Sequence, residues 1–472
     1  MREQQLLVEG RWSAGEGRAE VRAPYDGTVV AAVAQAGAAD IEAALAFAFA
    51  GRRAVAAQSS GERREVLRGI VDGLGRRAAE LTEVLVQESG KPVRAARAEV
   101  TRAIETFTLA AAEVSAPVGH AVPIDFDAAS KGYRCEVRRV PAGVVVGIVP
   151  FNFALNLGAH KVAPALAVGA PIIIKPPPQA PTAQLLLAEI AQAAGAHPAA
   201  LQVLPCSNAR AEQLATDVRV RVLSFTGSAK VGWRLKSRVA GKALLELGGN
   251  AAVLVCADAD LEWAAERCVA GGFGYAGQVC IKVQRVYVEA SVYERFLARV
   301  VARTRALVTG NPADDATTVG PVIDDASAER IESWVNEAVA AGATRLTGGV
   351  RRGRLLEPMV LTGAPSDAKV TLEEVFGPVM TVAPVADAAE GFTRINQGGY
   401  GLQAAVFTYD TRVVARAFTE LEVGGLIVND SPSFRSDNFP YGGVKGSGLG
   451  REGVRYAMEE LSELKALITA AR

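Results

Sequence analysis

Histidine and cysteine, the usual protein ligands of zinc, are scarce in this sequence. Among 472 residues there are three histidines and five cysteines, and the cysteines are scattered without a paired CxxC spacing. Zinc sites and disulfide frameworks need clustered or regularly spaced cysteines. We therefore expect no metal site and no disulfide, and a reducing compartment, which favours a cytoplasmic protein.

The sequence also lacks net charge and long apolar runs. Lys plus Arg and Asp plus Glu both number 51, so the whole chain offers no basic field for nucleic acid or an anionic membrane. The apolar runs, such as residues 144–149 and 170–174, are far shorter than the roughly 18 to 20 residues that cross a bilayer. Residues 1–12 show no signal-peptide pattern. We expect a soluble protein that binds neither nucleic acid nor membrane.

The pattern of apolar residues predicts an α/β protein with more than one domain. A chain of 472 residues exceeds the size at which a single hydrophobic core keeps growing. Residues 40–115 have a helical period, and from residue 143 short apolar strands alternate with helix-length segments, as in parallel βαβ units. A second block of this kind follows residue 251. The strands expected in the first block are residues 144–149, 171–175, 201–205, 222–226 and 244–247.

Three polar residues beside glycines or in turns are candidates for chemistry. A glycine-rich segment, residues 272–277, leads to Cys280, while Glu246 precedes the Gly248-Gly249 pair and Asn152 lies in Pro-Phe-Asn-Phe. Each residue alone has an ordinary alternative: an inert buried cysteine, a solvated glutamate, or an asparagine that caps backbone groups. The inert alternative is our interpretation of three other cysteines, Cys206, Cys256 and Cys268.

Two segments match the GxGxxG dinucleotide pattern, residues 272–277 and 448–453, but neither has the strand before and the helix after that this fingerprint needs. Residues 224–228, Ser-Phe-Thr-Gly-Ser, are a better candidate, because they end a buried strand and open a helix over residues 229–239. Lys175, at the carboxyl end of the strand expected over residues 171–175, is a second candidate. An ordinary strand-to-helix turn and a surface lysine remain the alternatives.

Taken together, these segments resemble the aldehyde dehydrogenase superfamily, in that family's order and near its spacings, over almost the whole chain. The motifs that carry the resemblance are Pro150-Phe151-Asn152-Phe153, Lys175-Pro176, Phe225-Thr226-Gly227-Ser228, Glu246-Leu247-Gly248-Gly249-Asn250, Gly277-Gln278-Val279-Cys280, Glu373-Glu374-Val375-Phe376-Gly377-Pro378 and Pro440-Tyr441-Gly442-Gly443-Val444-Lys445.

The resemblance implies a role for each candidate. Cys280 would be the nucleophile that forms a thiohemiacetal and then a thioester, and Asn152 would donate to the developing oxyanion together with the Cys280 backbone N–H. Glu246 would activate the water that hydrolyses the thioester. The implied cofactor-binding residues are Pro150, Phe151, Lys175, Pro178, Phe225, Thr226, Gly227, Ser228, Gly248, Glu374 and Phe376. Glu374 would bind the nicotinamide ribose, and Phe376 would pack beside the nicotinamide.

One departure from the family pattern bears on the cofactor. Many members that prefer NAD have a glutamate three residues after the lysine, where this chain has Pro178. A carboxylate there would repel the 2′-phosphate of NADP, so its absence admits NADP. We therefore expect NADP, or both NADP and NAD.

The resembled members act on small hydroxylated or anionic aldehydes: lactaldehyde, glyceraldehyde phosphate or phosphonoacetaldehyde. Arg435 occupies a substrate-side loop and would pair with a carboxylate or phosphate, although a salt bridge with Asp437 or Asp430 is the alternative that we favour. Arg285 is a weaker candidate, because it would also fit a solvent-facing strand position.

The resemblance finally implies a three-part architecture. A Rossmann-like cofactor domain (residues 1–118 and 143–245) and a catalytic domain (246–433) would be joined by a substrate-side loop and linker (434–454), and a β-arm (119–142 with 455–472) would build a homodimer or homotetramer. From the residues, the tail fits either a terminal helix or an edge strand. The alternatives to hydrolytic aldehyde oxidation are acyl transfer to coenzyme A or phosphate, and a cofactor-binding protein without turnover.

Overall fold

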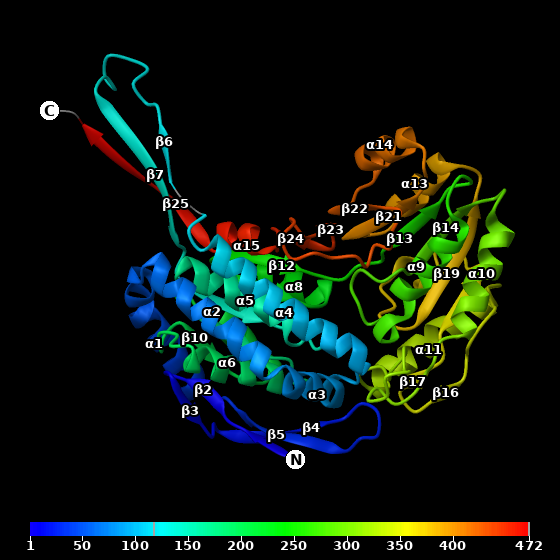
Figure 1. Ribbon diagram of the computed structural model, residues 1–472, viewed down its shortest axis with the longest axis horizontal. Coiled ribbons are helices and arrows are strands. Elements are labelled where there is room, and N and C mark those ends of the chain that lie inside the picture. Colours follow the sequence, from blue (N-terminus) through cyan, green and yellow to red (C-terminus); the bar gives the residue numbers. More distant parts are fainter. Residues whose placement is uncertain (117–118, 471–472) are drawn as a thin grey trace.

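The computed structural model describes residues 1–116 and 119–470 and has two large β-sheets, each covered by helices, with a narrow β-arm that projects from the body (Figure 1). The predicted α/β fold class is confirmed. Residues 117, 118, 471 and 472, which the expected limits of the cofactor domain and the arm include, lie outside the described residues.

The first sheet has the strand order β24-β12-β11-β8-β9-β10-β2-β3. Strands β12, β11, β8, β9 and β10 are parallel, and β24 at one edge and β2 and β3 at the other are antiparallel to their neighbours. Because parallel strands end at the same edge, the loops after β8, β9, β11 and β12 share one side of the sheet. The bounds are β2 (Leu6–Val8), β3 (Arg11–Ser13), β8 (Val144–Ile148), β9 (Ile172–Lys175), β10 (Leu201–Val203), β11 (Val220–Thr226), β12 (Lys242–Glu246) and β24 (Gly448–Leu449).

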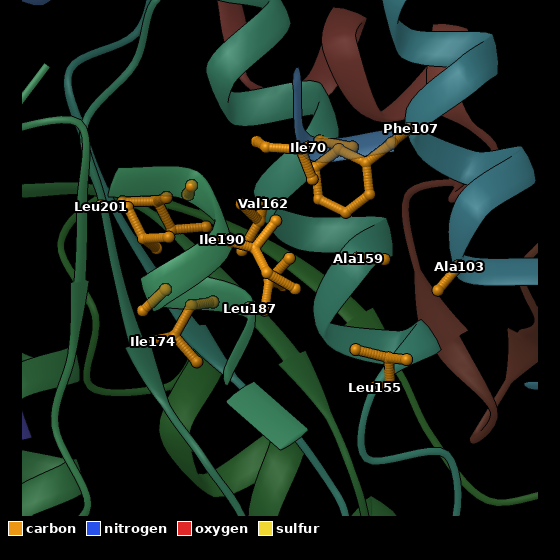
Figure 2. Packing of buried hydrophobic residues seen from close by; sticks show 14 of the residues in the cluster. Ile70, Ala103, Phe107, Leu155, Ala159, Val162, Ile174, Leu187, Ile190 and Leu201 are labelled. Atoms are coloured by element: carbon orange, nitrogen blue, oxygen red, sulfur yellow. The ribbon is translucent and has the colours of Figure 1, made fainter. Parts of the chain in front are cut away.

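Alternate side chains of these strands enter two separate cores. Ile172 and Ile174 pack into one cluster, whereas Ile173 packs into the cluster on the opposite face. Figure 2 shows Ile174 in the larger cluster, with Phe107 among the surrounding helices. That face carries α2 (Ser60–Arg76), α3 (Ala78–Ser89), α4 (Val93–Glu113), α5 (Asn156–Val168) and α6 (Thr182–Ala193), and the other carries α1 (Ala38–Ala57), α7 (Asn208–Ala215) and α8 (Ala229–Lys236).

The second sheet has the order β15-β18-β19-β14-β13-β21-β22, parallel except for the edge strand β15. Its strands are β13 (Ala252–Val255), β14 (Arg285–Glu289), β15 (Thr344–Arg345), β18 (Met359–Thr362), β19 (Val379–Val385), β21 (Gln403–Phe407) and β22 (Gly425–Val428). The helices around it are α9 (Leu261–Phe273), α10 (Tyr293–Arg305), α11 (Asp325–Ala340), α12 (Lys369–Leu372), α13 (Ala388–Asn396) and α14 (Thr411–Glu420).

Smaller elements complete the body. A separate three-stranded sheet near the N-terminus consists of β1 (Arg2–Gln4), β4 (Gly17–Arg22) and β5 (Val29–Gln35). Two short antiparallel pairs are β16 (Arg351–Arg352) with β17 (Leu355–Leu356) and β20 (Tyr400–Gly401) with β23 (Val444–Lys445).

The arm is a three-stranded sheet in which the C-terminal strand pairs with residues more than 300 positions earlier. Strand β7 (Tyr133–Pro141) lies between β6 (His120–Val122) and β25 (Ser462–Ala470), with Ser462 opposite Pro141 and Ala470 opposite Tyr133. Helix α15 (Val454–Glu460) precedes β25 and buries Met458 in the core of the first sheet. The tail is thus both a short helix and an edge strand, and only residues from Ser462 onward extend into the arm.

Among the described residues, no helix is long and apolar enough to span a membrane. Within the same residues, the side chains of His, Cys, Asp and Glu form no group of three that could hold a metal ion.

Candidate active site

Cys280 follows an unusual stretch of backbone at the end of α9. The 3-10 turn Gly274–Gly277 contains Tyr275 at φ 51°, Ala276 at φ 53° and Gly277 at φ 68°, three left-handed residues in a row. Non-glycine residues pay about 1 to 2 kcal/mol each for this conformation. A Cβ on Gly277 would lie 2.3 Å from the carbonyl oxygen of Gly377, so a glycine is needed there. The chain therefore turns sharply in a tightly packed place just before Cys280. Cys280 is partly exposed, whereas the other four cysteines are buried.

The turn after β12 is where the segments of the site meet. Glu246 ends β12, and Gly248 and Gly249 follow it. A Cβ on Gly249 would lie 2.2 Å from the carbonyl oxygen of Cys280, and a Cβ on Gly248 would lie 2.4 Å from Oε2 of Glu374. The Gly249 N–H also donates to Oε1 of Glu374 at 2.9 Å. The two glycines thus bring Glu246, Cys280 and Glu374 together from two different sheets.

Asn152 reaches the same place from the loop after β8. It is buried, and its Nδ2 donates to the carbonyl oxygen of Gln278 at 3.0 Å, two residues before Cys280. A side-chain amide has a second N–H to donate. Within residues 1–116 and 119–470, the Cys280 backbone N–H has no hydrogen-bond acceptor. The loop is held by Glu99 of α4, whose Oε1 accepts from the N–H groups of Leu155 and Asn156 at the start of α5.

Burial controls the protonation of the two titratable groups. Glu246 is 3% exposed, and neither carboxyl oxygen has a hydrogen-bond partner among the described residues. Burial, with the nearby negative charge of Glu452, raises the pKa of Glu246 well above its ordinary value. Burial likewise raises the pKa of the Cys280 thiol to about 11, although Tyr441 and Arg435 act in the opposite direction. A carboxyl group whose pKa is raised by burial takes up a proton more readily than an ordinary glutamate, which suits a general base.

A cavity of about 360 Å³ opens at the carboxyl edge of the first sheet. The side chain of Lys175 at the end of β9 is 4% exposed and has no hydrogen-bond partner in the described part of the chain. Arg234 of α8 also lines the cavity and pairs with Glu212 at 3.1 Å. The lining includes these residues predicted to bind a cofactor: Pro150, Phe151, Lys175, Pro178, Phe225, Thr226, Gly227 and Ser228. The predicted strand-to-helix turn is present, with Ser228 directly before α8, which ends at Lys236 rather than at residue 239.

The remaining predicted cofactor residues lie between this cavity and Cys280. The rings of Phe151 and Phe376 meet edge to face, with centroids 6.0 Å apart. Burial raises the pKa of Glu374 to about 7, while the Gly249 N–H and the charge of Lys282 favour its ionised form. Phe376 thus meets a residue of the cavity wall, and Glu374 meets the glycine turn that contacts Cys280.

Arg435 lies inside the site, but other protein groups occupy its guanidinium. Its Nη2 donates to Oε2 of Glu452 at 2.9 Å, and its Nε lies 3.7 Å from Oδ1 of Asp437. The predicted ion pair with Asp437 is therefore present, and Glu452 is a closer partner that the sequence did not suggest. Asp430 pairs instead with Arg267. The Arg435 guanidinium also stacks on Tyr441, 3.7 Å from the ring centroid.

The structure contradicts the alternative that Arg285 occupies a solvent-facing strand position. The arginine does not face solvent, because it is 3% exposed at the start of β14. Its guanidinium donates to three backbone carbonyl oxygens, those of Asn250, Arg394 and Ile395. Carbonyl groups at loop ends need donors when they are buried, so this arginine ties loops together and leaves no free face for a substrate.

The sequence analysis missed a buried polar cluster behind Cys280. Lys161 and His160 come from α5, whose residues are buried along its whole length. Lys161 Nζ contacts Oε1 of Glu452 at 3.3 Å, and His160 Nε2 contacts Oδ1 of Asp437 at 3.1 Å. Arg102 of α4 also pairs with Asp437. A lysine and a histidine inside an otherwise apolar helix were the available signal, because such residues are rarely buried without a partner.

Comparison with known proteins agrees with this geometry. Residues 12–467 match the model of the aldehyde dehydrogenase family. The chain belongs to the aldehyde dehydrogenase family. Members of this family are oxidoreductases that use NAD or NADP, so the predicted enzyme class and cofactor type are confirmed. A related aldehyde dehydrogenase, the 3-sulfolactaldehyde dehydrogenase of Priestia aryabhattai, is 41% identical over 465 residues, which cover 98% of this chain and 97% of the relative.

Two solved aldehyde dehydrogenases have nearly the same structure. Aldehyde dehydrogenase 21 from Physcomitrella patens, in complex with the reaction product succinate, superposes with a TM-score of 0.97 at 40% identity, covering 99% of this chain and 98% of that one. The NADP-dependent glyceraldehyde-3-phosphate dehydrogenase of Bacillus halodurans, complexed with NADP, also has a TM-score of 0.97, at 31% identity with full coverage of both chains.

Proposed function

We propose that this protein oxidises a small anionic aldehyde to its carboxylic acid by a thioester mechanism that ends in hydrolysis. The observation that carries the proposal is the meeting of Cys280, Glu246 and Asn152 around the Gly248-Gly249 turn. A nucleophile, a carboxyl group with a raised pKa and amide donors at one place are the parts that acyl transfer needs.

In the first half-reaction, the Cys280 thiolate attacks the aldehyde carbon, and a carbon–sulfur bond forms while the carbonyl oxygen becomes negative. The free N–H of the Asn152 amide and the Cys280 backbone N–H stabilise this oxygen. The bound nicotinamide cofactor would supply the hydride acceptor. Loss of the hydride leaves a thioester on Cys280.

In the second half-reaction, Glu246 takes a proton from water, which attacks the thioester and releases the acid and the cysteine. The buried position of Glu246, with both oxygens unpartnered among the described residues, suits a base that must bind a water. Acyl transfer to coenzyme A or phosphate would need no such base, and this argues for hydrolysis. A member that binds the cofactor without turnover would not need the assembled triad.

For the cofactor, we propose NADP or both NADP and NAD. Lys175 is buried beside Pro178 with its ammonium group uncommitted in the described residues, and Arg234, which pairs with Glu212, also lines the cavity. A 2′-phosphate would meet these cations and no carboxylate at position 178. Glu374 would hold the nicotinamide ribose, and Phe376 would pack against the ring.

For the substrate, we propose a sulfonate, carboxylate or phosphate near the aldehyde. Arg435 stacks on the ring of Tyr441, whose hydroxyl contacts the Cys280 sulfur. Arg102 is the partly exposed cation of the same cluster. Lys161, Arg102 and Arg435 contribute three positive charges to the cluster, and Glu452 and Asp437 contribute two negative charges, so these five residues together carry a net positive charge. The names of the similar sulfolactaldehyde dehydrogenase and of the succinate complex agree with such a substrate.

We also propose the domain limits expected above, except that the C-terminal part of the arm begins at Ser462, and we propose the arm as the element that joins subunits into a dimer or tetramer. Leu464, Leu467 and Ile468 on β25 are 56% to 61% exposed. An edge strand with exposed apolar side chains calls for a partner strand or surface.

The test is the appearance of reduced cofactor at its nicotinamide absorbance band. Purified protein is mixed with NAD or NADP and with matched pairs of aldehydes that differ only in a terminal sulfonate or carboxylate against a neutral group. We expect turnover by the wild type, faster with the anionic member of each pair, and none by Cys280→Ala. Equal turnover by Cys280→Ala would refute the mechanism, and a preference for neutral aldehydes would refute the substrate class.

A further inference from the structure

We propose that Tyr441 is an additional catalytic residue, whose hydroxyl donates a hydrogen bond to the Cys280 sulfur and holds it in the thiolate form. This inference depends on the proposed function, because it takes Cys280 as the nucleophile. Tyr441 precedes the Gly442-Gly443 pair, and its Oη lies 3.3 Å from the Cys280 Sγ.

The direction of the hydrogen bond follows from chemistry. A thiolate has no proton and can only accept, so the phenol must donate when Cys280 is ionised. Tyr441 is 2% exposed, and burial raises its pKa well above the ordinary value for tyrosine. The phenol therefore keeps its proton wherever the enzyme would work.

Three contacts hold the ring in place. The backbone of Tyr441 forms a β-bridge with Glu452, with its N–H donating at 3.0 Å and its carbonyl oxygen accepting at 2.6 Å. The carboxylate of Glu452 binds Arg435 at 2.9 Å, and Arg435 stacks on the Tyr441 ring at 3.7 Å. Phe439 packs against the ring from its own segment, with centroids 6.4 Å apart. Glu452 thus fixes the tyrosine through its backbone and, through Arg435, its ring.

The charges around the sulfur make this donor matter. Glu246 and Glu374 face Cys280 from the turn after β12 and from the loop before β19, and both disfavour a thiolate. Arg435 favours it from behind Tyr441, and Lys161 and Glu452 lie further back in the same cluster. Among the described residues, Tyr441 is the side chain that hydrogen-bonds to the sulfur, and this bond lowers the thiol pKa against the effect of burial.

The hydrogen bond stabilises the thiolate before attack and weakens as the sulfur attacks. The thiol proton has left to solvent before attack, and the sulfur electron pair forms the bond to the carbonyl carbon. The negative charge moves from sulfur to the carbonyl oxygen, so the Tyr441 bond weakens while the Asn152 bond strengthens. The phenol keeps its own proton throughout.

Removing the donor should produce a pH-dependent signature. Loss of a hydrogen bond to a charged group corresponds to about one to two pKa units, so Tyr441→Phe should raise the thiol pKa by at least about one unit. One unit lowers the thiolate fraction tenfold below the pKa but makes the thiolate about threefold more nucleophilic. At neutral pH, the variant should therefore react about threefold more slowly, and the two profiles should converge and cross at alkaline pH.

The experiment follows alkylation of Cys280 by iodoacetamide in the cofactor-free protein from pH 6 to 12, with brief pH-jump pulses at the alkaline points and with modification at this residue quantified by mass spectrometry. The control is Tyr275→Phe, which removes another buried phenol from the same part of the site, one that donates to the Ser89 carbonyl oxygen at 3.1 Å. We expect an alkaline shift and crossing profiles for Tyr441→Phe and an unshifted profile for the control.

Two outcomes would overturn the inference: a Tyr441→Phe profile that superposes on the wild type, or one that is lower by a constant factor at every pH, as expected from a purely structural role. Because alkylation needs no aldehyde, this result is separate from the Cys280→Ala turnover test. Turnover by Cys280→Ala would refute the proposed function even if Tyr441→Phe shifts the pKa of the Cys280 thiol.

Discussion

Replacing Glu246 by Gln should separate the two halves of the reaction. The side chain is 3% exposed, and neither carboxyl oxygen has a hydrogen-bond partner in the described residues. Glutamine has almost the same volume, so the change loses no contact and leaves no partner unpaired. It also removes the repulsion with Glu452 that accompanies ionisation. We expect the variant to fold with unchanged or slightly higher stability.

The expected effect is confined to hydrolysis. General base catalysis contributes about 10²- to 10⁴-fold, or roughly 3 to 5 kcal/mol of barrier, so steady-state turnover should fall by that factor. Cys280 and Asn152 are untouched, and the thioester should still form. The first turnover should therefore release about one reduced cofactor per active site as a burst, after which the acyl enzyme accumulates.

Stopped-flow absorbance with saturating aldehyde and cofactor measures both phases, and mass spectrometry of the quenched protein detects the acyl group. The pH dependence gives a second check. Since the pKa of Glu246 is raised and the ionised form is the base, wild-type hydrolysis should increase as the pH rises towards that pKa. The variant should lose this dependence. Undiminished steady-state turnover, or the loss of the burst together with turnover, would refute the assignment of Glu246 to hydrolysis.

Four further changes test other parts of the proposal. Asn152→Ala should lower kcat about 10²- to 10³-fold by removing an oxyanion donor, with no burst in stopped flow; normal burst kinetics would contradict this role. Pro178→Glu should raise KM for NADP about tenfold or more by repulsion of the 2′-phosphate, and KM for NAD should change little; equal effects in steady-state assays would count against the assigned cavity. Arg102→Met should reduce kcat/KM about tenfold or more for an anionic aldehyde relative to its neutral match; an unchanged ratio would exclude this arginine. Ile468→Asp on the exposed strand should lower the molar mass in light scattering, and an unaltered assembly would rule out this face of the arm.

Much of the catalytic core could be predicted from local sequence. Short apolar strands that end at Lys175, Thr226 and Glu246 indicated a parallel sheet, because strands that are buried on both faces of a sheet have few polar residues. Such a sheet places its strand ends at one edge. The glycines beside Glu246 and Cys280 marked close approaches, and in the structure a Cβ at Gly248 or Gly249 would lie only 2.4 or 2.2 Å from the nearest atom. Strand ends and glycine turns of this kind can be predicted from the sequence, because their backbone conformation depends on the residues within the motif.

The arginines show where local reasoning fails. The role of an arginine depends on the groups that its guanidinium contacts, and those groups come from distant segments of the chain. Arg285 meets carbonyl oxygens of residues 250, 394 and 395 and so serves the fold. Arg435 meets Glu452 and the Tyr441 ring and so serves the site. Nothing in the residues beside either arginine distinguishes these two outcomes.

The sequence by itself determined the α/β class, the strand ends and the family, because periodicity, turn residues and motif order are properties of short stretches. Only the tertiary structure decided that Tyr441 touches Cys280, that Lys161 and Glu452 face each other, and that the tail pairs with β7. These contacts join residues from 161 to more than 300 positions apart. Contacts at such separation depend on how sheets and helices pack as whole elements, which no local pattern encodes.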